Sequence, residues 1–159
     1  MRIIGIDPGL LHLGVVIIEK QNSWEILYAL SLKTCSSQSP SKRLHNIFIY
    51  LRETFQIYNP SFLVFEETIP KANPYQTSQI TQVCALIMVL AEENRIPYKT
   101  YSPTHWRRYL CGNGRAKRAD LLKVLENLLG GKIGAKIKDE HILDALGLAI
   151  TYALEQGIF

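Results

Sequence analysis

The fold is decided near the N-terminus by the stretch Ile3-Ile4-Gly5-Ile6-Asp7-Pro8-Gly9-Leu10-Leu11-His12. A run of branched apolar residues ends at one carboxylate, a Pro-Gly pair breaks the run, and a second apolar run begins at Val15. This pattern predicts a buried strand, a tight turn and a second strand. A carboxylate in a buried strand is costly unless a cation or hydrogen bonds compensate its charge. Asp7 is therefore either a structural residue of the turn or part of a metal site.

The composition is that of an ordinary globular protein. The chain has 159 residues, of which 47% are hydrophobic and 20% charged, and we expect one domain over residues 1–159. No apolar run approaches the roughly 20 residues that a membrane span needs, and the start lacks a signal-peptide pattern. The three cysteines have no metal-ligand spacing, and their odd number without a secretion signal favours reduced thiols in a cytoplasmic-type compartment.

The positive charge is concentrated in one segment. The net charge is +4, which agrees with a polyanionic partner but does not prove one. Six cations fall within 17 residues: Arg107, Arg108, Arg115, Lys117, Arg118 and Lys123. Taken alone, this run favours a solvated helical face, whereas beside a cluster of metal-binding carboxylates it would favour contacts to nucleic-acid phosphates.

The periodicity along the chain predicts an α/β fold. We expect three strands joined by short turns, then helices alternating with two further strands. This order predicts a five-stranded mixed sheet flanked by helices on both faces. The expected strands are residues 3–7, 13–19, 24–32, 62–65 and 98–101, and the expected helices are residues 40–58, 75–94, 102–110, 116–129 and 139–155.

Acidic residues stand where these elements would bring them together. Asp7 ends the first strand and Glu66 ends the fourth, so both would emerge at one edge if those strands are parallel neighbours. His141 and Asp144 are three residues apart and share a helix face. Carboxylate oxygens suit hard divalent cations, and two such ions can assist phosphodiester hydrolysis. An imidazole is a softer ligand than a carboxylate, so it would favour Mn²⁺ or accept it as well as Mg²⁺.

Four segments in the same order resemble the RuvC family of Holliday-junction resolvases. The opening Ile4-Gly5-Ile6-Asp7-Pro8-Gly9 resembles the first family motif, and Phe62-Leu63-Val64-Phe65-Glu66 the second. Gly112-x-Gly114-x-Ala116 is similar to the glycine-containing segment before the family's basic helix. Asp144-Ala145-Leu146-Gly147 resembles the closing motif. The resemblance extends over nearly all of the chain and implies a ribonuclease H-like fold.

The resemblance implies a metal-dependent endonuclease that resolves four-way DNA junctions by paired nicks, leaving 5′-phosphates. Asp7, Glu66 and Asp144 would hold two Mg²⁺ ions, with Mn²⁺ as an alternative. The fourth family position falls on His141, where many members have Asp, and Glu140 remains a second candidate for it.

Further residues acquire expected roles from the same resemblance. Arg118, with Lys117 beside it, matches a family lysine that contacts the phosphate near the metals. Ile69 stands where many members have an aromatic residue that stacks on bases, and Ile69 or Tyr75 would take that role.

A twofold homodimer would supply two sites for two opposed cuts. The nine apolar residues 83–91 of the predicted helix 75–94 exceed the stripe that one sheet covers, so we expect this helix at the dimer interface. Whether a branch-migration motor is a partner, and whether the host is a cell, an organelle or a virus, is left open by the sequence.

Three other interpretations compete with this hypothesis. One is a nuclease of the same fold that acts on RNA or RNA–DNA hybrids, such as the YqgF-like proteins, although their usual opening motif is absent. Another is a nucleic-acid-binding module with a degenerate site, which the complete acid set disfavours. The third is a sugar-kinase-like or Hsp70-like ATPase, whose chains are far longer.

Overall fold

A computed structural model describes residues 1–70, 73–131, 133 and 137–159. Its five strands form one mixed sheet in the order β3-β2-β1-β4-β5. The first three form an antiparallel meander, and β4 and β5 run parallel to β1. Their bounds are β1 (Arg2–Asp7), β2 (His12–Lys20), β3 (Trp24–Lys33), β4 (Phe62–Glu66) and β5 (Tyr98–Tyr101). The predicted mixed sheet is confirmed.

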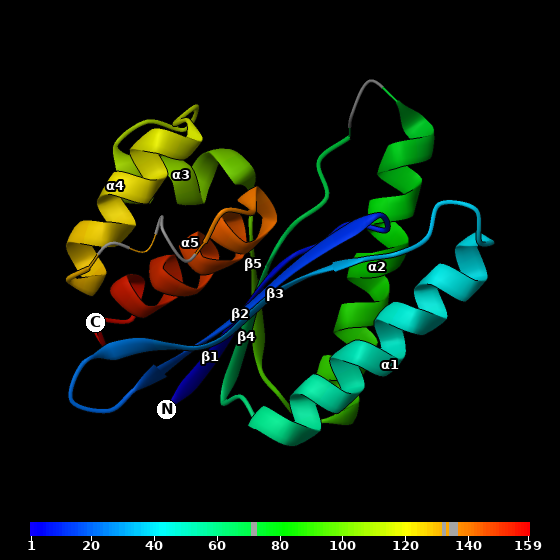
Figure 1. Ribbon diagram of the computed structural model, residues 1–159, viewed down its shortest axis with the longest axis horizontal. Coiled ribbons are helices and arrows are strands. Elements are labelled where there is room, and N and C mark those ends of the chain that lie inside the picture. The colour runs from blue at the N-terminus through cyan, green and yellow to red at the C-terminus, as the bar shows by residue number, and fades with distance from the viewer. Residues whose placement is uncertain (71–72, 132, 134–136) are drawn as a thin grey trace.

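Helices cover both faces of this sheet, as the sequence predicts (Figure 1). One face carries α1 (Pro40–Tyr58) and α2 (Pro74–Glu93). The other carries α5 (Glu140–Glu155), with α3 (Pro103–Cys111) and α4 (Arg118–Leu129) packed outside it. In the described part of the chain, no helix has the length and apolar character needed to cross a bilayer.

Strand alternation sorts the core into two layers. Successive residues of β1 point to opposite faces, so Ile3 packs under α5 whereas Ile4 packs under α1 and α2. By the same alternation, Asp7 lies on the α5 face, two residues beyond Gly5. The face that a side chain enters is therefore fixed by its position in the strand.

Two glycines let α5 lie directly on the sheet. A Cβ atom at Gly5 would collide with the carbonyl oxygen of Ala145, and one at Gly14 would collide with the carbonyl oxygen of His141. Asp7 and Gly14 are partners in the β1–β2 ladder. This close approach therefore brings the first turns of α5 against the end of β1, where Asp7 lies.

Candidate active site

The sheet brings the first two candidate carboxylates to one edge. β1 and β4 are parallel neighbours, and Ile6 pairs with Phe65. Asp7 and Glu66 follow these two residues directly, so they occupy adjacent strand ends and point to the α5 face. The predicted juxtaposition of the two strand ends is confirmed, and it follows from the parallel pairing alone.

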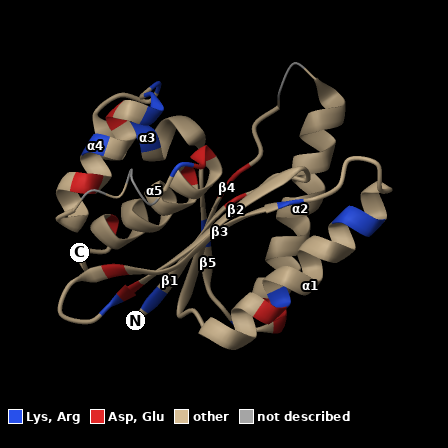
Figure 2. Ribbon diagram, viewed as in Figure 1, with Lys and Arg blue, Asp and Glu red and all other residues tan. Residues whose placement is uncertain are grey.

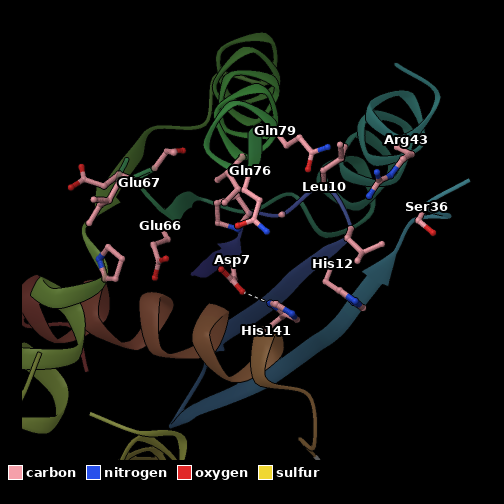
Figure 3. A pocket seen from close by; sticks show the side chains of 17 residues that line it. Asp7, Leu10, His12, Ser36, Arg43, Glu66, Glu67, Gln76, Gln79 and His141 are labelled. Atoms are coloured by element: carbon pink, nitrogen blue, oxygen red, sulfur yellow. Dashed lines mark hydrogen bonds and ion pairs between the residues drawn. The ribbon is translucent and has the colours of Figure 1, made fainter. Parts of the chain in front are cut away.

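The first turns of α5 supply two more candidates. Asp139 caps this helix by accepting a hydrogen bond from the backbone N–H of His141 at 2.8 Å, as expected for a helix N-terminus. His141 then reaches Asp7, with Nδ1 2.7 Å from Oδ2, as Figure 3 shows. Glu140 is exposed and makes no such contact. The geometry therefore favours His141 over Glu140.

Helix α3 holds the remaining two carboxylates through two adjacent side chains. The Trp106 Nε1–H donates to Glu66 Oε2 at 2.9 Å. The guanidinium of Arg107 forms an ion pair with Asp144 and lies over the Trp106 ring, 4.4 Å from its centroid. Residues of β1, β4, α3 and α5 thus meet at this end of the sheet.

The carboxylates repel one another in a buried setting. Burial raises the pKa of Glu66 to about 7, the charges of Asp7 and Asp144 add to the shift, and the Trp106 hydrogen bond opposes it. Burial likewise raises the pKa of Asp144 to about 6, against the opposing charge of Arg107. The hydrogen bond to Asp7 raises the pKa of His141. Burial is thus the main cause of both raised carboxyl pKa values, and a bound cation would compensate the cost of ionising these buried groups.

These residues fit a divalent-metal site by their chemistry, but their side chains are not gathered around one point. Among the residues that the structure describes, no three His, Cys, Asp or Glu side chains are close enough to share an ion. Asp144 and Glu66 are instead turned to Arg107 and Trp106. Metal binding would therefore exchange these hydrogen bonds, and the proton between Asp7 and His141, for metal contacts.

A cavity of about 480 Å³ opens beside the strand ends. Asp7, Glu66 and His141 line it, and so does Ile69, which is 40% exposed. Ile69 thus stands where it can contact a substrate, whereas Tyr75 is 64% exposed on the first turn of α2 and is not among the lining residues.

The predicted basic run divides into one site residue and an exposed group. Arg107 is engaged with Asp144, as described above. The other five are exposed, and no hydrogen bond or ion pair connects them to the four candidate ligands; they are Arg108, Arg115, Lys117, Arg118 and Lys123. Figure 2 shows basic residues over α3, α4 and the turn between these helices. The backbone N–H of Lys117 donates to Asp120 at the start of α4.

Two contacts at the site lie outside the roles expected from the sequence. The His12 ring stacks on the His141 ring with centroids 5.2 Å apart, and His12 also lines the cavity. Strand alternation was a usable signal, because His12 lies on the same face as Gly14. Trp106 is fully buried, and no signal in the sequence predicts its hydrogen bond with Glu66.

Comparison with known proteins agrees with this geometry. Residues 3–152 match the family model described as "Crossover junction endodeoxyribonuclease RuvC". A protein of that name from Prochlorococcus marinus (strain MIT 9301) is 32% identical over 159 residues, covering 99% of each chain. One from Caldicellulosiruptor saccharolyticus is 28% identical, covering 99% of this chain and 95% of the relative.

Solved structures show the same fold. "T. thermophilus RuvC in complex with Holliday junction substrate" superposes with a TM-score of 0.88 at 24% identity, covering 99% of this chain and 97% of the other. The fold and the matched family together define a metal-dependent nuclease of the ribonuclease H-like class. More narrowly, the chain belongs to the RuvC family of crossover junction endodeoxyribonucleases, whose enzymes are metal-dependent. The family membership and the fold predicted from the sequence are confirmed.

Proposed function

We propose that this chain hydrolyses one phosphodiester bond in each of two opposed strands of a four-way DNA junction, using divalent ions held by Asp7, Glu66, Asp144 and His141. The observation that carries this proposal is the convergence of three carboxylates and an imidazole from β1, β4 and α5 on one end of the sheet, in a chain of the RuvC family. Burial, and to a smaller extent the charge of Asp7, disfavours the ionised forms of Glu66 and Asp144, and a bound cation would compensate that cost.

Oxygen ligands dominate the set, which favours Mg²⁺ and, through the His141 imidazole, also accommodates Mn²⁺. When bound, a pair of such ions would lower the pKa of an attacking water and stabilise the 3′-oxygen leaving group, so that the product carries a 5′-phosphate. Asp7 and Glu66, on rigid strand ends, would fix the ligand positions. Asp144 and His141 would close the site from α5.

Cations of the chain would hold the substrate. Arg107 lies beside Asp144 and can exchange that partner for a phosphate oxygen, since a guanidinium binds either group well. Lys117 and Arg118, at the start of α4, are exposed and would neutralise phosphates near the scissile bond. Arg108, Arg115 and Lys123 would add contacts to the DNA backbone that position it without reading its sequence.

Two cuts in opposed strands need two sites, and a twofold dimer supplies them. Helix α2 buries Val83, Ile87 and Leu90 against the sheet, but leaves Met88 37% and Val89 57% exposed on its other side. We propose this exposed apolar face as the dimer interface.

A cleavage assay on end-labelled substrates tests the proposal. The protein is incubated with a four-way junction, a duplex of the same sequence and an RNA–DNA hybrid, each with Mg²⁺, Mn²⁺ or chelator. Paired, symmetric nicks in the junction with either metal, and none with chelator, are expected. Cleavage of the hybrid in preference to the junction would refute the proposal and favour a ribonuclease.

A further inference from the structure

Arg43 is a buried cation without an anionic partner in the described part of the chain. It lies in the first turns of α1 and is only 8% exposed, yet it forms no ion pair with any described carboxylate. Its Nε–H donates to Thr34 Oγ1 at 2.9 Å, and that hydroxyl donates in turn to the carbonyl oxygen of Leu10. A guanidinium is always charged, and burying such a charge unpaired is costly.

The guanidinium opens onto the cavity that Asp7 and Glu66 also line. Arg43 and Ser36 lie toward one end of this cavity, Glu66 and Glu67 toward the other, and Asp7 between them (Figure 3). The hydrogen bond to Thr34 uses Nε alone. Neither terminal nitrogen of Arg43 has a partner among the described residues, and both remain accessible to solvent. The hydrogen bonds thus hold the side chain with its two free N–H₂ groups toward the cavity.

We propose that Arg43 binds a phosphate of the DNA substrate other than the one that is cleaved. This inference rests on the proposed function, because a strand whose scissile phosphate meets the carboxylates must place neighbouring phosphates in the same cavity. Guanidinium groups bind phosphate through two parallel hydrogen bonds. The DNA substrate would supply the anionic partner that Arg43 lacks within the described protein. Arg43 would also offset the repulsion between the DNA and the end of the cavity where Glu66 and Glu67 lie.

The binding role and a purely structural role predict opposite results for Arg43→Met. Methionine keeps the apolar stem, and Thr34 retains the Leu10 carbonyl as its partner. Replacing a buried charge with a well-packed apolar side chain is often neutral or stabilising. We therefore expect R43M to melt at the wild-type temperature or above it, but to bind the junction about tenfold more weakly at 0.15 M salt.

Binding is measured by fluorescence anisotropy in EDTA, so that no metal ion or cleavage contributes. The slope of log Kd against log salt should fall in magnitude by about 0.7–0.9, the value for one lost phosphate contact. Arg43→Lys, which keeps the charge, should recover most of the affinity. Arg52→Met is the matched control: Arg52 lies on the same helix, exposed over the Phe48 ring, and we expect it to leave affinity and slope unchanged.

Neutral methylphosphonates locate the contact on the substrate. Each phosphate that flanks the cleavage site is replaced in turn by a methylphosphonate. We expect one such replacement to weaken junction binding by the wild type but not to weaken binding by R43M any further. An R43M protein that melts lower or does not fold, or that binds with unchanged Kd and slope, would overturn the inference. If wild type fails to cleave junctions at all, the proposed function fails instead. The inference would also be overturned if millimolar inorganic phosphate competed with the junction while no methylphosphonate affected wild type and R43M differently. The site would then bind free anions rather than a phosphate of the DNA.

Discussion

Replacing Trp106 by Phe would remove the hydrogen bond to Glu66 while keeping an aromatic ring in the core. Trp106 is fully buried, its ring lies against Gly147, and Nε1 is 2.9 Å from Glu66 Oε2. A hydrogen bond to a charged group contributes about 1.5–3 kcal/mol. The smaller ring leaves a void of roughly 40 Å³, which costs about 1 kcal/mol. We expect W106F to lose about 2.5–4 kcal/mol of unfolding free energy at pH 8 without metal.

Trp24→Phe provides the matched control for this change. Trp24 is also buried, and its Nε1–H donates to a neutral acceptor, the carbonyl oxygen of Ile158, at 3.0 Å. The same void and a neutral hydrogen bond together contribute about 2 kcal/mol. The loss of unfolding free energy in W106F should therefore exceed that in W24F by about 0.5–2 kcal/mol, which is the additional contribution of a hydrogen bond to a charged acceptor.

The pH dependence separates this explanation from simple packing. Because the folded pKa of Glu66, about 7, exceeds its ordinary value of 4.5, stability falls as pH rises from about 4.5 to 7. The Trp106 hydrogen bond lowers the pKa of Glu66, so its removal raises that pKa further. The loss of stability then continues to higher pH. In urea unfolding with EDTA, the W106F deficit relative to W24F should therefore widen from pH 5.5 to pH 8. Equal deficits at both pH values would show that the lost stability comes from packing alone.

Three further results are expected. Burial alone would raise the pKa of Glu155, but hydrogen bonds from a lysine, a tyrosine and a histidine lower it to about 2. Glu155→Gln should thus lose about 2 kcal/mol of stability at pH 7, a deficit that disappears as pH falls from about 4.5 to 2 in thermal melts; a deficit that persists at pH 2 would contradict the ion pair. Arg107→Gln should raise the pKa of Asp144 above about 6, which carboxyl ¹³C NMR would detect in metal-free protein, and an unshifted titration would exclude the pairing. Val89→Lys should yield monomers at micromolar concentration by light scattering and abolish paired nicks, whereas Ile57→Lys, at an exposed apolar position of α1, should not; an intact V89K dimer would reject the α2 interface.

The sequence predicts the order of elements well because the strands are short, apolar and separated by strong turn signals. The observed ends differ from the expected ones by a residue or two, as at β2, which begins at His12 instead of residue 13. Parallel pairing of β1 and β4 then follows from the α/β order and brings Asp7 and Glu66 together. Local periodicity sufficed for this part of the site.

The contacts made by α3 could not be predicted in the same way. Arg107 and Trp106 reach Asp144 and Glu66 across 37 and 40 residues of sequence, and periodicity within a helix carries no information about such distant partners. Arg43 did leave a signal, since it precedes the buried Ile47 and Leu51 at four-residue spacing. That spacing predicts a buried arginine, but its orientation toward the cavity required the fold.

The role proposed for Asp7 is that of a metal ligand in a junction-cleaving site. Single-turnover cleavage of a labelled four-way junction by Asp7→Asn, with Mg²⁺ or Mn²⁺ at saturating protein, tests it most directly. The amide keeps the size of the side chain but removes its charge, so paired nicks should fall below detection while junction binding in EDTA stays at or above the wild-type level. Cleavage by D7N at the wild-type rate would contradict the account.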